Sequence, residues 1–112
     1  MSLHLLGKTG SKSGDCPSLL ASDRGTYVAQ GWKTERDDTV EIPHALLGFA
    51  LPNTFIGATM TDTGRGTFRL TGRPVTDPDD LAQLTLASDE SAIEVPKIRR
   101  TFYGAADSYA VD

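Results

Sequence analysis

The sequence predicts an α+β fold that is predominantly antiparallel β, with two related hairpin-plus-strand units sharing one core and one short helix near residues 78–85. Two echoes and one helix signal support this fold. DRGTYVAQG at 23–31 resembles GRGTFRLTG at 64–72, and VEIP at 40–43 resembles IEVP at 93–96. Because both echoes occur in the same order, we interpret them as an internal duplication with units at about 16–49 and 57–102.

The first echo has the chemistry of a β-hairpin. Asp23 can hydrogen-bond its own backbone and Gly25 tolerates positive φ, so the two residues favour a turn. The residues that follow, 26–30, are rich in β-formers and predict a strand. The same reasoning predicts a second hairpin, in which strands 55–61 and 67–71 flank a turn at 62–66. The apolar start, MSLHLLG, is interpreted as a strand and not as a signal peptide.

The second echo predicts two half-buried strands. VEI and IEV alternate apolar and charged residues, and each is followed by a proline, Pro43 or Pro96. Proline also suits the first position of a helix. We therefore expect HALLGF and KIRRTF to form short helical turns.

The clearest helix lies in an insertion that only the second unit contains. Thr76 or Asp77 can cap it, Pro78 suits its first position, and acidic residues in the first turn complement the helix dipole. Leu81 and Leu84 are then expected to face the core.

Length and composition limit the class of protein. With 112 residues the chain fits one domain, expected over 1–104, and residues 105–112 are expected to form a flexible tail. The net charge of −4 argues against a general nucleic-acid binder. A single cysteine, Cys16, suits a reducing compartment, and the apolar segment 45–60 is too interrupted to span a membrane. We expect a cytoplasmic protein.

No residue pattern signals catalysis or metal binding. Cys16 with His44 can be written as a nucleophile and base, but no local signature supports this, and free cysteines are usually buried hydrophobes. One cysteine and two distant histidines do not make a zinc site. Helix capping explains the acidic residues at 77–80 better than a calcium loop. The sequence thus predicts no enzyme, no metal and no cofactor.

Basic and aromatic residues are the candidates for an interaction surface. Arginines spaced four apart share one face of a straight strand, and a second basic cluster follows the IEVP motif. The first unit has Val28 and Trp32 where the second has arginines. If exposed, such a set suits an interface, and if buried, the aromatic residues are core. The candidates are Tyr27, Trp32, Arg65, Arg69, Arg73, Arg99 and Arg100.

The segments DCPSLLASDRGTYVAQGWK and VTDPDDLAQLTLASDESAIEVP carry a family resemblance. Together they resemble small uncharacterised actinobacterial proteins with CP, then DRGTYVxQGWK, then DPxxLAxL, then VEIP. Such proteins are often encoded beside helix-turn-helix regulators, so the resemblance implies a DNA-binding regulator as partner. Here the pattern is split, because the CP and DRGTYVAQGWK parts fall in the first unit and the DPDDLAQL part falls in the second.

We therefore expect a small, non-enzymatic protein-interaction or regulatory module. Its partner is expected to be a protein, and two related units also allow a homodimer. The alternative is a nucleic-acid-binding protein that uses the arginine strand face. A hydrolytic or ligand-binding protein built on Cys16 and His44 is the least favoured hypothesis.

Overall fold

The computed structural model describes residues 1–9 and 16–101. Within them lie nine strands and two short helices: β1 (Leu3–Lys8), β2 (Ser18–Ser22), β3 (Thr26–Lys33), β4 (Thr39–Pro43), η1 (His44–Phe49), β5 (Thr54–Ile56), β6 (Met60–Asp62), β7 (Thr67–Thr71), β8 (Arg73–Pro74), α1 (Pro78–Leu81) and β9 (Glu90–Arg99). The expected tail, 105–112, lies outside the described residues. All of the strand pairing among them is antiparallel, as predicted.

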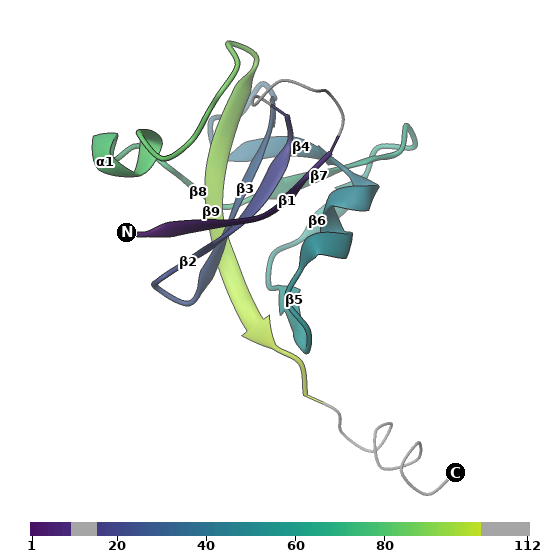
Figure 1. The fold of residues 1–112 in the computed structure, drawn as a ribbon. Helices are drawn as coiled ribbons and strands as arrows, with labels where there is room; N and C mark the ends of the chain where they lie inside the picture. Colours follow the sequence, from purple (N-terminus) through teal and green to yellow (C-terminus); the bar gives the residue numbers. More distant parts are fainter. Residues whose placement is uncertain (10–15, 102–112) are drawn as a thin grey trace, which may run out of the picture.

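The strands close into a ring around one core. β3 pairs with both β9 and β4, β4 pairs with β7, and β8, which follows β7 after Gly72, pairs with β9. β1 and β2 extend the sheet from β3, and β6 extends it from β7. Figure 1 shows the 10-residue β9 running the height of the molecule, with β1, β2 and β3 crossing beside it.

Alternate residues of β3 enter two separate apolar clusters. Tyr27 and Ala29 lie in the main core, together with residues from β2, β4, η1, β5, β7 and β9. Val28 points to the opposite face, as the two-residue period of a strand requires. There it packs in a second cluster with Leu20 and Ala92, against which Met1, Leu3 and Leu84 also pack. The N-terminus and the α1 region lie together on this side of the sheet (Figure 1).

The predicted hairpins form, but the second is shorter than expected. β2 and β3 enclose the turn at 23–25, and β6 and β7 enclose the turn at 63–66. The strand predicted over 55–61 is wrong, because the chain divides there into β5 and β6. A side chain at Gly57 would overlap Ile98, and the Gly57 amide donates to the Pro96 carbonyl instead of continuing the hairpin.

The two proline-ended strands have different outcomes. β4 ends at Pro43 and HALLGF forms the 3-10 helix η1, as predicted. The prediction of a helical turn over KIRRTF is wrong, because β9 continues through Pro96 to Arg99. Pro96 lies opposite Thr26, and the residues after it pair with β5. Pairing with β5 satisfies the backbone of this segment and outweighs the proline signal.

The short helix begins as predicted and is shorter than expected. The Asp77 side chain accepts a hydrogen bond from the Asp79 amide, and Pro78 occupies the first turn. α1 covers Pro78–Leu81, after which Leu84 reaches the second cluster. Gln83 then bonds to β1, since its side chain accepts from the Leu3 amide and donates to the Met1 carbonyl.

The two halves of the ring pair in the same register. Tyr27 lies opposite Val95 in β3 and β9, and Phe68 lies opposite Ile42 in β7 and β4. The equivalence continues along both strand pairs, because matching positions on β3 and β7 differ by 41 residues and those on β9 and β4 differ by 53. The matching pairs are Thr26↔Pro96 with Thr67↔Pro43, Val28↔Glu94 with Arg69↔Glu41, and Ala29↔Ile93 with Leu70↔Val40. The two sequence echoes therefore occupy corresponding places in the fold.

Candidate functional site

Each hairpin turn binds a glutamate from the other half of the chain. Thr26 donates to Glu94 at 2.6 Å, and the guanidinium of Arg24 donates to the same carboxylate at 3.0 Å. The hydroxyl of Ser22 accepts from the Arg24 and Thr26 amides and completes the turn. We call these four residues the Glu94 cluster. Because the glutamate lies about 70 residues from the turn, the cluster joins distant parts of the chain.

A matching set, the Glu41 cluster, consists of Thr63, Arg65, Thr67 and Glu41. Thr67 donates to Glu41 at 2.8 Å and Arg65 donates to it at 2.9 Å, while the Thr63 hydroxyl accepts from the Arg65 amide. These hydrogen bonds, that of Thr67 first, hold the pKa of Glu41 below its ordinary value. The repeated Arg-Gly-Thr sequence therefore makes the same kind of contact with a distant glutamate in both hairpins.

The echoed glycines have equivalent close contacts. A Cβ at Gly31 would lie 2.6 Å from the Glu41 carbonyl oxygen, and one at Gly72 would lie 2.6 Å from the Glu94 carbonyl oxygen. Gly25 and Gly66 both have positive φ in the turns. These four positions need glycine for backbone reasons, without any ligand.

The halves differ at Val28 and Arg69. Val28 is buried beneath the N-terminal residues and Leu84, in the second cluster. The corresponding face of β7 lacks this cover, and Arg69 is 37% exposed there. Its guanidinium pairs with Glu35, with one hydrogen bond of 2.9 Å, and this pairing lowers the pKa of Glu35 to about 2. The N-terminal residues and the insertion that carries α1 thus cover Val28, whereas Arg69 is partly exposed and charged.

The predicted arginine face is divided by the break at Gly72. Arg65 lies in the turn and Arg69 in β7, and both act on Glu41 electrostatically. Arg73 follows in β8 and lies opposite Glu94. Since Arg65 and Arg69 are paired with glutamates, two of the three charges are already balanced.

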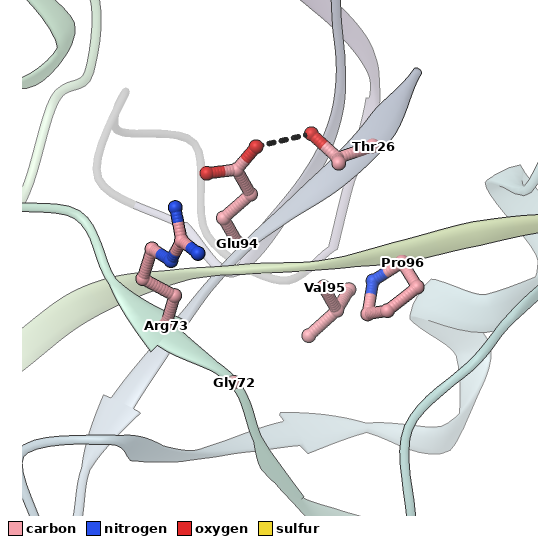
Figure 2. Close-up of a pocket in the computed structure, with 6 residues that line it drawn as sticks. All are labelled: Thr26, Gly72, Arg73, Glu94, Val95 and Pro96. Atoms are coloured by element: carbon pink, nitrogen blue, oxygen red, sulfur yellow. Dashed lines mark hydrogen bonds between the residues drawn. The ribbon is translucent and has the colours of Figure 1, made fainter. Parts of the chain in front are cut away.

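Arg73 lines a crevice between β8, β9 and the start of β3. Its volume is about 300 Å³, and its walls are Thr26, Gly72, Arg73, Glu94, Val95 and Pro96. Figure 2 shows the side chains of Arg73 and Glu94 side by side, with Val95 and Pro96 further along β9. At the equivalent place in the other half, the half-buried Trp32 lies opposite Glu41.

Tyr27 belongs to the core, which is the alternative that the sequence left open. It is 0% exposed, and its hydroxyl accepts from the Leu51 amide at 2.7 Å and bonds to the Thr54 hydroxyl. The Lys97 ammonium lies 5.9 Å from the ring centroid. Tyr27 thus joins β3 to the segment before β5 and offers no contact surface.

Arg99 and Arg100 lie beside an apolar pair that the sequence analysis did not single out. Phe55 and Ile98 are directly opposite each other in β5 and β9, and they are 44% and 41% exposed. With Arg99, Arg100 and Thr101 they line a hollow of about 420 Å³. We call Phe55, Ile98, Arg99 and Arg100 the ribbon surface. The sequence gives little signal for this pair, because it predicts that 55–61 pairs with 67–71, whereas β5 pairs with β9.

The contacts of His44 are those of a structural side chain. Cys16 is buried at the start of β2. The His44 ring contacts the Thr67 carbonyl at 3.1 Å, lies 3.5 Å from the Asp62 carboxylate and packs on Phe68. These neighbours give no support to a nucleophile and base pair.

Residues 1–9 and 16–101 contain no group of three or more His, Cys, Asp or Glu side chains placed to hold a metal ion. No helix in the same residues has the length and apolar character of a membrane span.

Comparisons with models of known families, with curated proteins and with solved structures find no match for the chain. The resemblance to small actinobacterial proteins therefore stays a prediction.

Proposed function

We propose that this chain is a non-enzymatic protein-interaction module that contacts its partner through the ribbon surface. The observation that carries the proposal is the exposed Phe55–Ile98 pair beside two arginines. Contiguous exposed apolar side chains rimmed by polar residues mark interaction sites, and aromatic and arginine side chains are enriched at protein interfaces. β5 and the end of β9, which carry the ribbon surface, extend away from the closed ring (Figure 1). A partner can therefore reach this surface without disturbing the core.

The chemistry of the ribbon surface defines the partner. Phe55 and Ile98 require apolar side chains, and Arg99 with Arg100 adds positive charge to a chain whose net charge is −4. We infer that the partner presents an apolar segment flanked by acidic residues. A helix-turn-helix regulator, the partner implied by the resemblance, is the first protein to test.

The test compares three forms of the protein as bait in extracts of its source organism. They are the wild type, the double variant Phe55→Ser/Ile98→Ser and the control Leu5→Ser, which removes an apolar side chain of similar exposure from β1. We expect one partner to bind the wild type and the control, and to be lost from the double variant. Titration of that purified partner should then show at least about a tenfold weaker Kd for the double variant.

Two results would overturn this proposal. One is a partner that binds all three forms equally. The other is an enzymatic activity of the wild type, on any substrate, that is lost in His44→Ala. The nucleic-acid alternative predicts binding to a DNA duplex that weakens steeply with salt and is lost in Arg65→Ala/Arg69→Ala. The pairing of these arginines with Glu41 and Glu35 disfavours that outcome.

We also propose that the two halves arose by duplication of one unit. The shared register, the two glutamate clusters and the matched glycine contacts support this origin. If it is correct, residues 16–49 and 57–102 expressed as separate chains should associate in a 1:1 complex, detected by analytical ultracentrifugation. Fragments that remain unfolded when mixed would speak against interlocking units.

A further inference from the structure

The crevice beside Arg73 combines an exposed guanidinium with one exposed apolar side chain, that of Pro96. The exposed Pro96 forms its apolar side, whereas Val95 is 1% exposed and belongs to the main core, and Gly72 packs closely against β9 (Figure 2). A volume of about 300 Å³ is at the lower end of the range for small-molecule sites. The crevice is therefore large enough for a ligand of a few non-hydrogen atoms.

Among the described residues that line the crevice and the hollow beside it, Arg73 is the basic group that has no ion pair. Glu94 accepts from Arg24 and Thr26, so its charge is already compensated. In the adjoining hollow, the N-terminal ammonium group of Met1 pairs with Asp80 at 2.8 Å, and Asp77 caps α1. Among residues 1–9 and 16–101, no carboxylate lies within ion-pair distance of Arg73. An exposed guanidinium in such a place recruits an anion.

The other half of the chain supplies an internal comparison. Five of the six lining residues have equivalents of the same kind, namely Thr67, Gly31, Glu41, Ile42 and Pro43. The sixth differs, because Trp32 stands where Arg73 stands. The crevice geometry therefore belongs to the repeated scaffold, and the arginine is the feature specific to this half.

We propose that this crevice binds a small carboxylate ligand with an aliphatic body, and that Arg73 is the residue that binds the carboxylate. The planar guanidinium matches the two oxygens of a carboxylate, and the exposed Pro96 ring matches the aliphatic part. This site is separate from the ribbon surface and does not rest on the interaction proposal.

The experiment is an NMR titration of the full chain with 3-methylbutanoate as the probe. Matched compounds are 3-methylbutylamine, which reverses the charge, 3-methylbutanamide, which removes it, and inorganic phosphate, which lacks the aliphatic body. We expect saturable shifts at the amides of Thr26, Gly72 and Val95 with the carboxylate alone. Loss of one charge-assisted contact in Arg73→Gln should weaken binding at least about tenfold.

Two variants separate the site from general effects. Arg73→Trp introduces the residue that the other half uses, and we expect a folded protein that no longer binds. Arg69→Gln removes a neighbouring arginine already paired with Glu35, and it should bind as the wild type does. If Arg73→Trp fails to fold, Arg73→Gln remains the test.

Several outcomes would overturn the proposal. They are equal shifts with the amine or the amide, phosphate binding as tightly as the carboxylate, unchanged binding in Arg73→Gln, or the absence of saturable shifts. None of these outcomes bears on the partner experiment, because that experiment uses different residues.

Discussion

The Glu94 and Glu41 clusters share their arginine, threonine and glutamate contacts, with Ser22 in one where Thr63 stands in the other, yet they lie in different surroundings. Beside the Glu94 cluster, the facing residue of β3 is Val28, covered by the N-terminal residues and the α1 region. Beside the Glu41 cluster, the facing residue of β7 is Arg69, which is uncovered and paired with Glu35. The shared residues therefore stabilise the fold. The two halves differ in which strand face is covered and in which one carries an exposed charge.

The largest expected difference between the halves is at Tyr27 and Phe68. Tyr27 is fully buried, whereas Phe68 is half-buried at the edge of the core. Tyr27→Ala should lower the free energy of unfolding by about 3–5 kcal/mol, and Phe68→Ala by clearly less. Urea denaturation measures both. If Tyr27→Ala does not fold, Tyr27→Phe, which removes only the hydroxyl, should cost about 1 kcal/mol. Equal losses at the two positions would contradict the difference in burial.

The glycine contacts should behave alike in both halves. Gly31→Ala and Gly72→Ala each place a methyl group against a backbone carbonyl, and each should cost about 1–3 kcal/mol. Thermal unfolding of the two variants measures the effect. The control is Gly48→Ala, whose added Cβ meets no atom within 4 Å. If only one of the two substitutions lowered the stability, the two glycines would not be structurally equivalent.

Glu41 and Glu94 should also contribute similar amounts to the free energy of unfolding. Glu41→Gln and Glu94→Gln each weaken charge-assisted hydrogen bonds, and a loss of about 1–2 kcal/mol is expected for each. The pKa of Glu41 is lowered in the folded chain, so its contribution is present above the ordinary glutamate pKa and is lost as pH falls through the folded pKa. Urea unfolding between pH 7 and pH 3 should therefore show a shallower acid decline for Glu41→Gln. The same acid decline in both proteins would argue against the assignment.

The smallest effect concerns the pair of Arg69 and Glu35. Its hydrogen bonds lower the pKa of Glu35 to about 2, but both side chains are substantially exposed, and exposed pairs contribute little to stability. Carboxylate NMR titration should find a midpoint near this value in the wild type and a higher one in Arg69→Gln. An unshifted midpoint in the variant would contradict the pairing.

Much of the fold follows from local sequence signals. Turn residues at 23–25 predicted the first hairpin, and alternation in VEIP and IEVP predicted parts of β4 and β9. The 41-residue and 53-residue offsets between the echoes correspond to two matching strand pairs. These predictions succeeded because the residues that form turns and strand faces act within a few positions of each other.

The errors arose where distant strands decide local structure. Pro96 looks like a strand end in isolation, yet pairing of β9 with Thr26 and then with β5 carries the strand onward. The same pairing divides 55–61 and exposes Phe55 beside Ile98. The ion-pair partners of Arg65 and Arg69 were also invisible, because Glu41 and Glu35 lie 24 and 34 residues away.

The pairing of β3 with β9 has a consequence for how the chain folds. Thr26 and Pro96 are 70 positions apart, so the ring closes only after the last strand has been made. Closing such long loops is slow relative to forming local contacts, and proteins with many distant contacts fold in about milliseconds to seconds. During synthesis, the edge of β3 that carries Tyr27 therefore remains open until residues 90–96 leave the ribosome. An unpaired strand edge of this kind is a general site of aggregation while a chain is incompletely folded.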